Sequence, residues 1–121
     1  MKNILIIEDD EFLRSLIKKK LLSDGFDVIS AIDGEDGIRK TEEKKTDLIL
    51  LDLVLPTIDG FGVLAKIKGN PNTSSIPVII LSNLSQKEDI DKGMKLGATD
   101  YIIKAQSTPE EIVEKVKNTL K

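Results

Sequence analysis

Five short apolar runs divide the chain, and their regular spacing is the feature that most constrains the fold. Each run has the length of a β-strand, and most are apolar at consecutive positions, as strands buried on both faces are. The stretches between them are long enough for a helix. The runs lie at 4–7 (ILII), 27–30 (DVIS), 48–53 (LILLDL), 77–81 (PVIIL) and 101–103 (YII).

The intervening stretches show the periodicity of amphipathic helices. The weakest is 34–44, which contains Gly37 and has Ile38 as its one large apolar residue. The apolar stripes expected to face the core are Leu13, Ile17 and Leu21 in the first helix, Phe61, Leu64, Ala65 and Ile67 in the third, and Ile112, Val113, Val116 and Leu120 in the last.

Residues that start and stop helices support these boundaries. Asp10 is expected to cap the first helix, and Gly25 and Gly97 are placed to end helices. Two later helices are predicted to begin with a capping box, Ser85 with Glu88 and Thr108 with Glu111. Strand and helix therefore alternate five times along the chain.

This alternation predicts an α/β fold in which helices cover both faces of a parallel sheet, a three-layer, doubly wound (βα)5 sandwich. The 121 residues have the size of one domain, and 40% are hydrophobic. No linker or repeat interrupts the pattern, and the fifth helix takes the sequence to its end. We therefore expect residues 1–121 to form a single domain without an output domain.

The composition excludes several classes of function. With no cysteine and no histidine, the chain has neither disulfides nor Ser-His catalysis nor His-ligated zinc. The net charge of −3 gives no reason to expect direct binding to nucleic acid. No apolar run approaches the roughly 18 residues of a membrane span, so we expect a soluble, cytoplasmic protein.

Polar side chains follow the predicted strands where a doubly wound sheet binds its ligands, outside the carboxyl ends of the strands. Glu8 and Asp9 follow the first run, and Asp52 lies near the end of the third. Ser82 follows the fourth run and Lys104 the fifth. We expect these residues to meet at one edge of the sheet.

Such a cluster suits a hard cation and phosphoryl chemistry. Neighbouring carboxylates repel one another unless a cation lies between them. Ligand sets made only of oxygen favour Mg²⁺ or Mn²⁺. A carboxylate beside a cation, an ammonium and a hydroxyl is suited to accept a phosphoryl group, whose charge the cations offset.

The motifs IIEDDE (6–11), LLDLVLPTIDG (50–60), VIILSN (78–83) and GATDYIIK (97–104) make the whole chain resemble a response-regulator receiver domain of two-component signalling. The resemblance implies a flavodoxin-like sheet in the order 2-1-3-4-5. It also implies a role for each matching residue: Glu8, Asp9, Asp52 and the backbone carbonyl of Val54 as ligands of Mg²⁺ or Mn²⁺, Asp52 as phosphoacceptor, Lys104 as the phosphate-pairing lysine, and Ser82 and Tyr101 as the switch pair.

The resemblance further implies the upstream and downstream partners of the protein. A histidine kinase or phosphotransfer protein would supply the phosphoryl group, and the face made by the fourth helix, fifth strand and fifth helix would change for a downstream protein. The chain would be a phosphoacceptor in signalling or a phosphorelay, not a conventional enzyme. It would be a monomer or a weak dimer linked to phosphorylation.

Three positions, 82, 83 and 105, depart from the usual receiver pattern. Ala105 follows Lys104 where receivers mostly have a proline in a cis peptide, so we predict a trans Lys104–Ala105 bond. Ser82 replaces the commoner threonine, and Asn83 stands where a small residue is usual. Asn83 is expected either to narrow access to the site or to donate to the phosphoryl group. Val54 and Leu84 carry no group that orients water, which predicts slow self-dephosphorylation.

Three other functions stay open from the residues. The chain could be a receiver-like scaffold that binds proteins without being phosphorylated. It could be a metal-dependent phosphatase with an aspartyl nucleophile, although Val54 occupies the place of the second Asp that such enzymes use as an acid. It could bind flavin, although aromatic residues make up only 3% of the chain.

Overall fold

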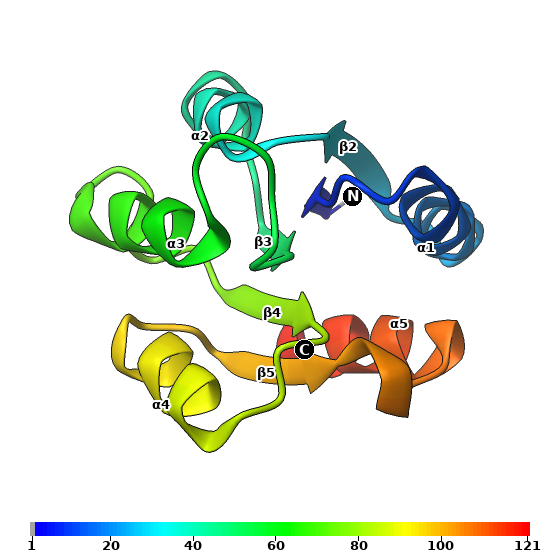
Figure 1. The fold of residues 1–121 in the computed structure, drawn as a ribbon. Coiled ribbons are helices and arrows are strands. Elements are labelled where there is room, and N and C mark those ends of the chain that lie inside the picture. The colour runs from blue at the N-terminus through cyan, green and yellow to red at the C-terminus, as the bar shows by residue number, and fades with distance from the viewer. Residues whose placement is uncertain (1) are drawn as a thin grey trace.

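The computed structural model describes residues 2–121, in which a five-stranded sheet lies between two layers of helices (Figure 1). The strands are β1 (Asn3–Ile7), β2 (Asp27–Ala31), β3 (Leu48–Leu51), β4 (Val78–Ser82) and β5 (Asp100–Ile103). The helices are α1 (Glu11–Ser23), α2 (Gly34–Glu43), α3 (Gly60–Gly69), α4 (Lys87–Lys95) and α5 (Pro109–Thr119), with a short 3₁₀ turn, η1 (Lys104–Gln106), after β5.

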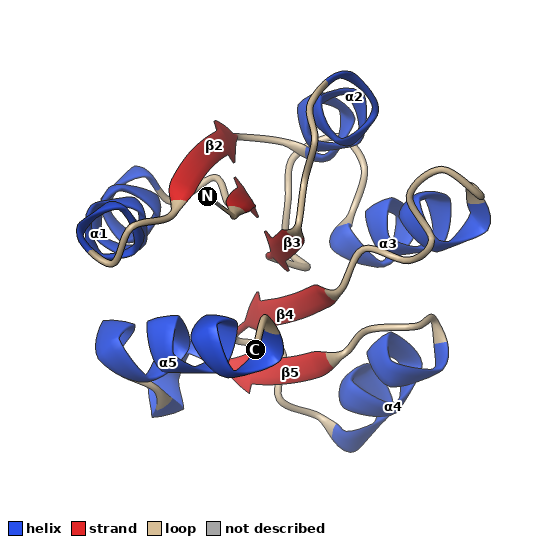
Figure 2. Ribbon diagram, turned by 180° about the vertical axis from the view of Figure 1, so that it is seen from behind, coloured by secondary structure: helices blue, strands red, loops and turns tan. Residues whose placement is uncertain are grey.

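All strand pairs are parallel, and the sheet order is β2-β1-β3-β4-β5. The predicted fold class, the flavodoxin-like order and the five helices are thereby confirmed. Helices α1 and α5 lie on one side of the sheet, and α2, α3 and α4 lie on the other (Figures 1 and 2). Because every strand runs the same way, all five carboxyl ends reach one edge.

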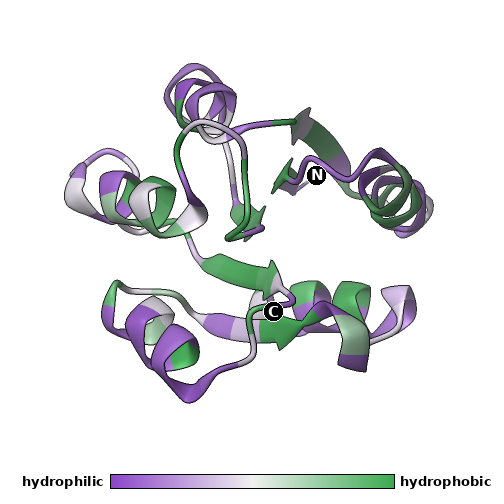
Figure 3. Cartoon of the chain, viewed as in Figure 1, coloured by the Kyte–Doolittle hydropathy of each residue, from purple (hydrophilic) through white to green (hydrophobic). Residues whose placement is uncertain are grey.

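The unbroken apolar runs exist because both faces of the sheet are buried. Along β1, Ile4 and Ile6 belong to the core cluster under α1 and α5, whereas Leu5 and Ile7 belong to the cluster under α2 and α3. Successive side chains of a strand point to opposite faces, so both sets must be apolar. Figure 3 shows the result, with hydrophobic strands inside and hydrophilic outer helix surfaces.

Most predicted helix ends are confirmed. The Asp10 side chain accepts a hydrogen bond from the Leu13 amide and caps α1. Thr108 and Glu111 form the predicted capping box of α5. Gly25 and Gly97 follow α1 and α4 with φ values of 92° and 110°, in the left-handed region that favours glycine. These ends set the loop lengths at the two edges of the sheet.

Two details of the sequence prediction are wrong. Helix α4 begins at Lys87 with Gln86 as its N-cap, and no side chain caps it, so Ser85 and Glu88 do not form a capping box. The helix thus begins one residue later than the local pattern implies. In α3, the predicted core residue Ala65 is exposed, and Val63 is buried instead.

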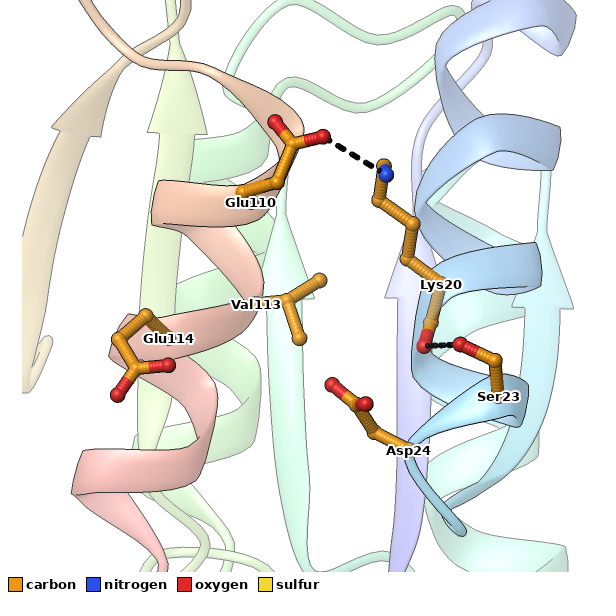
Figure 4. A pocket seen from close by; sticks show the side chains of 6 residues that line it. All are labelled: Lys20, Ser23, Asp24, Glu110, Val113 and Glu114. Atoms are coloured by element: carbon orange, nitrogen blue, oxygen red, sulfur yellow. Dashed lines mark hydrogen bonds and ion pairs between the residues drawn. The ribbon is translucent and has the colours of Figure 1, made fainter.

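Helices α1 and α5 meet along a charged seam on the outer surface (Figure 4). Lys20 pairs with Glu110 at 2.8 Å, and Val113 lies beneath them at the edge of a cavity of about 240 Å³. Both partners are partly exposed, and exposed ion pairs contribute about 1 kcal/mol or less. The seam therefore orients the two helices rather than determining stability. Within residues 2–121, no helix is long and apolar enough to cross a membrane.

Gly60, the first residue of α3, allows the loop after β3 to pass close to the helix. A Cβ atom at this position would overlap the backbone oxygen of Asp52 and the Cα of Leu53. The Gly60 amide donates to the Leu53 carbonyl at 2.8 Å, which fixes the close approach. The position of Asp52 therefore depends on the absence of a side chain at residue 60.

We expect Gly60→Ala to destabilise the protein by about 2 kcal/mol, because overpacking against backbone forces the loop to move. Gly69→Ala is the matched control, since α3 ends at Gly69 and a Cβ there meets nothing within 4 Å. It should be neutral or stabilising by up to about 1 kcal/mol, because alanine favours helix. Urea unfolding of both variants measures the difference, and equal stabilities would contradict this account.

Candidate functional site

The sheet ladder carries the site residues to the carboxyl edge. The Glu8 amide donates to the Ala31 carbonyl and the Asp52 amide to the Ile7 carbonyl, both at 3.0 Å. Each bond extends strand pairing by one residue beyond β1 and β3. Glu8 and Asp52 are thus held as rigidly as strand residues, although the hydrophobic runs have ended.

Glu8, Asp9 and Asp52 come together as predicted. One carboxylate oxygen from each lies within 4.8 Å of the other two. Glu8 and Asp52 are buried, at 1% and 4% exposed, whereas Asp9 is exposed. The cluster therefore has two oxygens fixed in the protein and a third at the solvent edge.

Lys104 reaches across the sheet edge to both buried carboxylates. Its Nζ lies 3.0 Å from Asp52 Oδ2 and 2.6 Å from Glu8 Oε1. Burial by itself lowers the pKa of Lys104, but the contacts with Glu8 and Asp52 outweigh it and raise the pKa above its ordinary value. The lysine is consequently a fixed cation that holds two like charges together.

Glu8 is the most perturbed carboxyl group of the site. Burial raises its pKa from 4.5 to about 7, against the opposing effects of Lys104 and of the Asp10 amide, which donates to Glu8 Oε2 at 3.0 Å. The ion pair with Lys104 is short but poorly aligned for a hydrogen bond. Among residues 2–121, Glu8 Oε1 is a buried oxygen without a hydrogen-bond donor.

These oxygens have the chemistry of a site for a hard divalent cation. The candidate ligands are all carboxylates, and two of the three are buried. Asp52 Oδ1 accepts from the Val54 amide at 3.2 Å, so the chain turns back toward the cluster at residue 54. Ligation by the Val54 carbonyl stays a prediction, as does Mg²⁺ or Mn²⁺ itself.

The two predicted switch residues meet at one backbone segment. Ser82 is fully buried at the end of β4, and its hydroxyl accepts from the Leu84 amide at 3.2 Å. The Tyr101 hydroxyl donates to the Leu84 carbonyl at 2.5 Å. The residues lie on neighbouring strands, since Ile80 pairs with Tyr101 in the register of β4 and β5. Ser82 and Tyr101 are therefore both hydrogen-bonded to Leu84.

Two contacts of the site were not anticipated from sequence. Arg14, on α1, donates to the Glu8 carbonyl at 2.8 Å and fixes the turn after β1. Asn83 Oδ1 accepts from the Ala105 amide at 3.0 Å. No described peptide bond is cis, so the Lys104–Ala105 bond is trans, as predicted. The unusual residues at 83 and 105 were noted in the sequence, but only the fold brings them into contact.

Comparison with known proteins agrees with this geometry. The model of the response regulator receiver domain family matches residues 4–117. The chain therefore belongs to the response regulator receiver domain family, a class of signalling proteins. The resemblance inferred from its motifs is confirmed.

Curated relatives are named as transcriptional regulators. RpaA of Synechocystis, a "DNA-binding dual master transcriptional regulator", is 38% identical over the whole of this chain and half of its own length. PhoP of Bacillus subtilis, a regulator of alkaline phosphatase synthesis, is 37% identical over 99% of this chain and 49% of its own length. The chain thus spans about half the length of these relatives.

Solved structures share the fold over nearly the full chain. A CheY-like receiver domain from Methanospirillum hungatei superimposes with a TM-score of 0.92 and 28% identity, covering 99% of this chain and 94% of its own. The Mn²⁺-bound form of the response regulator Rcp1 gives a TM-score of 0.88 at 28% identity, covering 98% and 93%. Both agree with the sheet order found here.

The raised pKa of Glu8 predicts a pH effect in the metal-free protein. We expect the Glu8 carboxyl carbon to titrate at about pH 7 in ¹³C NMR, above the ordinary value of 4.5. Because the folded chain binds this proton more tightly than the unfolded chain, the stability it provides is complete below pH 4.5. That stability is lost as the pH rises through 7.

Two variants test the cause of this shift. Lys104→Met should raise the Glu8 pKa further, because the ammonium lowers it, and Asp52→Asn should lower the pKa, because the neighbouring charge raises it. A Glu8 signal that titrates at its ordinary pH in the unmodified protein would contradict the assignment. Shifts of the Glu8 pKa in the same direction in both variants would also contradict it.

Proposed function

We propose that this receiver domain is a phosphorylation switch in which Asp52 accepts a phosphoryl group from a histidine kinase or a phosphotransfer protein. The observation that carries the proposal is the position of Lys104, whose ammonium contacts Asp52 and Glu8 together. A lysine used only to neutralise charge would have no need to lie at the solvent-facing edge, beside a nucleophile. Here it lies where the oxygens of a transferred phosphoryl group would come.

The chemical step needs little from the protein besides placement. An oxygen of the Asp52 carboxylate attacks phosphorus, a new P–O bond forms, and the bond between phosphorus and the donor nitrogen breaks. The electron pair of that bond stays on the imidazole nitrogen of the donor. Lys104 then pairs with the phosphoryl oxygens, and positioning with charge stabilisation is what such transfers require.

Glu8, Asp9 and Asp52 would hold Mg²⁺ or Mn²⁺, with the Val54 carbonyl as a further ligand. The cation would supply positive charge to the phosphoryl oxygens during transfer. The acidic cluster, in which two of the three carboxylates are buried, supports this assignment. The Mn²⁺-bound form of the related Rcp1 supports it too.

Phosphorylation would be read through Ser82 and Tyr101. The Ser82 hydroxyl oxygen accepts from the Leu84 amide, and a phosphoryl group on Asp52 would draw the hydroxyl to donate its proton to a phosphoryl oxygen. Movement of Ser82 would release or tighten the contact of Tyr101 with Leu84, and so alter the α4–β5–α5 face. In energetic terms the modification shifts the population of two existing states.

The partners follow from this scheme. A downstream protein would recognise the α4–β5–α5 face, and the domain would act in the cytoplasm as a monomer or as a weak dimer formed on phosphorylation. Relatives named as transcriptional regulators suggest gene control as one use of the signal.

The direct test is modification of Asp52. Incubation with Mg²⁺ and acetyl phosphate should add one phosphoryl group to the unmodified protein, seen by intact mass, and none to Asp52→Asn. Asp47→Asn is a matched control, because Asp47 is an acid at the opposite end of β3 whose carboxylate accepts from the Asn3 amide. It should be phosphorylated like the unmodified protein.

The alternatives give different results in the same experiment. A protein that is never modified, and whose partner binding is the same with and without phosphodonor, would be a scaffold. Continuous release of phosphate from external substrates would indicate a phosphatase. Equal phosphorylation of Asp52→Asn would overturn the assignment of Asp52.

The side chain of Val54 predicts a long-lived phosphoryl group. It is 59% exposed beside Asp52, and its isopropyl group cannot hydrogen-bond an attacking water. We expect Val54→Asn to lose phosphate several-fold faster than the unmodified protein after removal of the donor. Val54→Ile, which also lacks a polar group, serves as control and should remain slow. Faster loss from the unmodified protein than from Val54→Asn would refute the idea.

A further inference from the structure

A hydrogen bond between Asn83 and Ala105 links the end of β4 to the segment that follows β5 and contains Lys104. Asn83 directly follows β4, and Ala105 is the middle residue of η1, which begins at Lys104. The Asn83 side-chain oxygen accepts from the Ala105 amide at 3.0 Å. The bond therefore fixes the backbone immediately after the lysine to the strand that lies between β5 and β3.

Lys104 needs such an anchor because its ammonium lies far from its own backbone. The side chain starts at the end of β5 and passes the end of β4 to reach Asp52 after β3 and Glu8 after β1. A lysine side chain has several rotatable bonds, and ordering it costs conformational entropy. When the backbone on both sides of Lys104 is fixed, the side chain has fewer conformations to lose when its ammonium is placed.

We propose that Asn83 is a positioning residue for phosphoryl transfer, which acts by holding the Lys104–Ala105 segment so that the ammonium stays between Asp52 and Glu8. This inference rests on the proposed function and deepens it. It also connects two departures from the receiver pattern. A proline at 105 has no N–H, so the bond to Asn83 exists only because residue 105 is not proline.

Asn83 also lies between Ser82 and Leu84, the residues that make the switch contacts. Its placement therefore affects more than one side chain. Ser82 precedes Asn83, and Leu84, which contacts Ser82 and Tyr101, follows it. Asn83 thus adds a third tie between the end of β4 and the neighbouring chain. If Ser82 shifts on phosphorylation, Asn83 carries the movement to the lysine segment as well.

A different role for Asn83 is direct contact with the phosphoryl group through its amide nitrogen. Substituting Asn83, with either alanine or proline at residue 105, distinguishes the positioning role from direct contact. Asn83→Leu keeps the size of the side chain and removes the acceptor, and Ala105→Pro removes the donor. In the positioning role, the two substitutions break one bond, so their effects overlap. In direct contact, the effect of Asn83→Leu is the same whichever residue occupies 105.

The readout is the affinity for beryllofluoride in saturating Mg²⁺, measured by calorimetry beside the affinity for Mg²⁺ alone. Loss of one hydrogen bond should weaken beryllofluoride binding by Asn83→Leu about three- to tenfold. Mg²⁺ affinity should change less than about twofold, because the carboxylates are untouched. In the Ala105→Pro background, Asn83→Leu should produce no further loss. Equal losses in both backgrounds, no loss, or equal weakening of Mg²⁺ binding would overturn the proposal.

A second measurement does not depend on phosphorylation chemistry or on how Ala105→Pro folds. Amide hydrogen exchange of Ala105 in the unmodified protein should be slower than in Asn83→Leu, while the Ser107 amide, which donates to the Lys104 carbonyl, is the internal reference. Unchanged exchange at Ala105 would show that the bond does not order the segment. If beryllofluoride fails to bind the unmodified protein, the proposed function fails, and the exchange data still decide whether Asn83 holds Ala105.

Discussion

The ion pairs of Lys104 with Asp52 and Glu8 are the interaction on which the carboxyl edge of the sheet depends. Two buried carboxylates within a few ångströms repel each other, and burial, the largest cause, raises the pKa of Glu8 to about 7 although Lys104 acts to lower it. The ammonium offsets that repulsion at the two buried carboxylates, and Asp9 stays at the surface. The exposed carboxylate leaves one side of the cluster open to solvent.

The backbone around this cluster holds its side chains in place. The ladder bonds to Ala31 and Ile7 extend the rigidity of the sheet to Glu8 and Asp52. Gly60 lets the helix α3 approach the backbone at Asp52, so the loop after β3 has little freedom to relax. The site is therefore supported by backbone packing, and its charges meet because the strands that carry them are parallel and adjacent.

The end of β4 is the second organising element. Three consecutive residues make three different ties there: Ser82 to the Leu84 amide, Asn83 to the Ala105 amide, and Leu84 to the Tyr101 hydroxyl. A change at the phosphoryl site would reach both the lysine segment and the aromatic ring through these neighbours. In this chain the bond to Ala105 is a substitute for the rigidity that a proline after the lysine would provide.

The sequence by itself determined the fold and the membership of the site, because both depend on local periodicity. Apolar runs with intervening amphipathic stretches require a covered parallel sheet, and parallel strands deliver Glu8, Asp9, Asp52, Ser82 and Lys104 to one edge. Asp10, Thr108, Gly25 and Gly97 could be read in advance because each acts within a few residues of itself.

Only the tertiary structure decided what depends on residues far apart in the chain. The predicted box at Ser85 is absent, because helix α4 begins one residue later with Gln86 as its N-cap. The pKa of Glu8 is raised by burial and partly lowered again by Lys104, which comes from the far end of the chain. Asn83 was conspicuous in the sequence, but its partner Ala105 lies on a neighbouring strand end. Periodicity reports which face of an element is buried, whereas a hydrogen bond between two loops depends on distances that only the packed sheet sets.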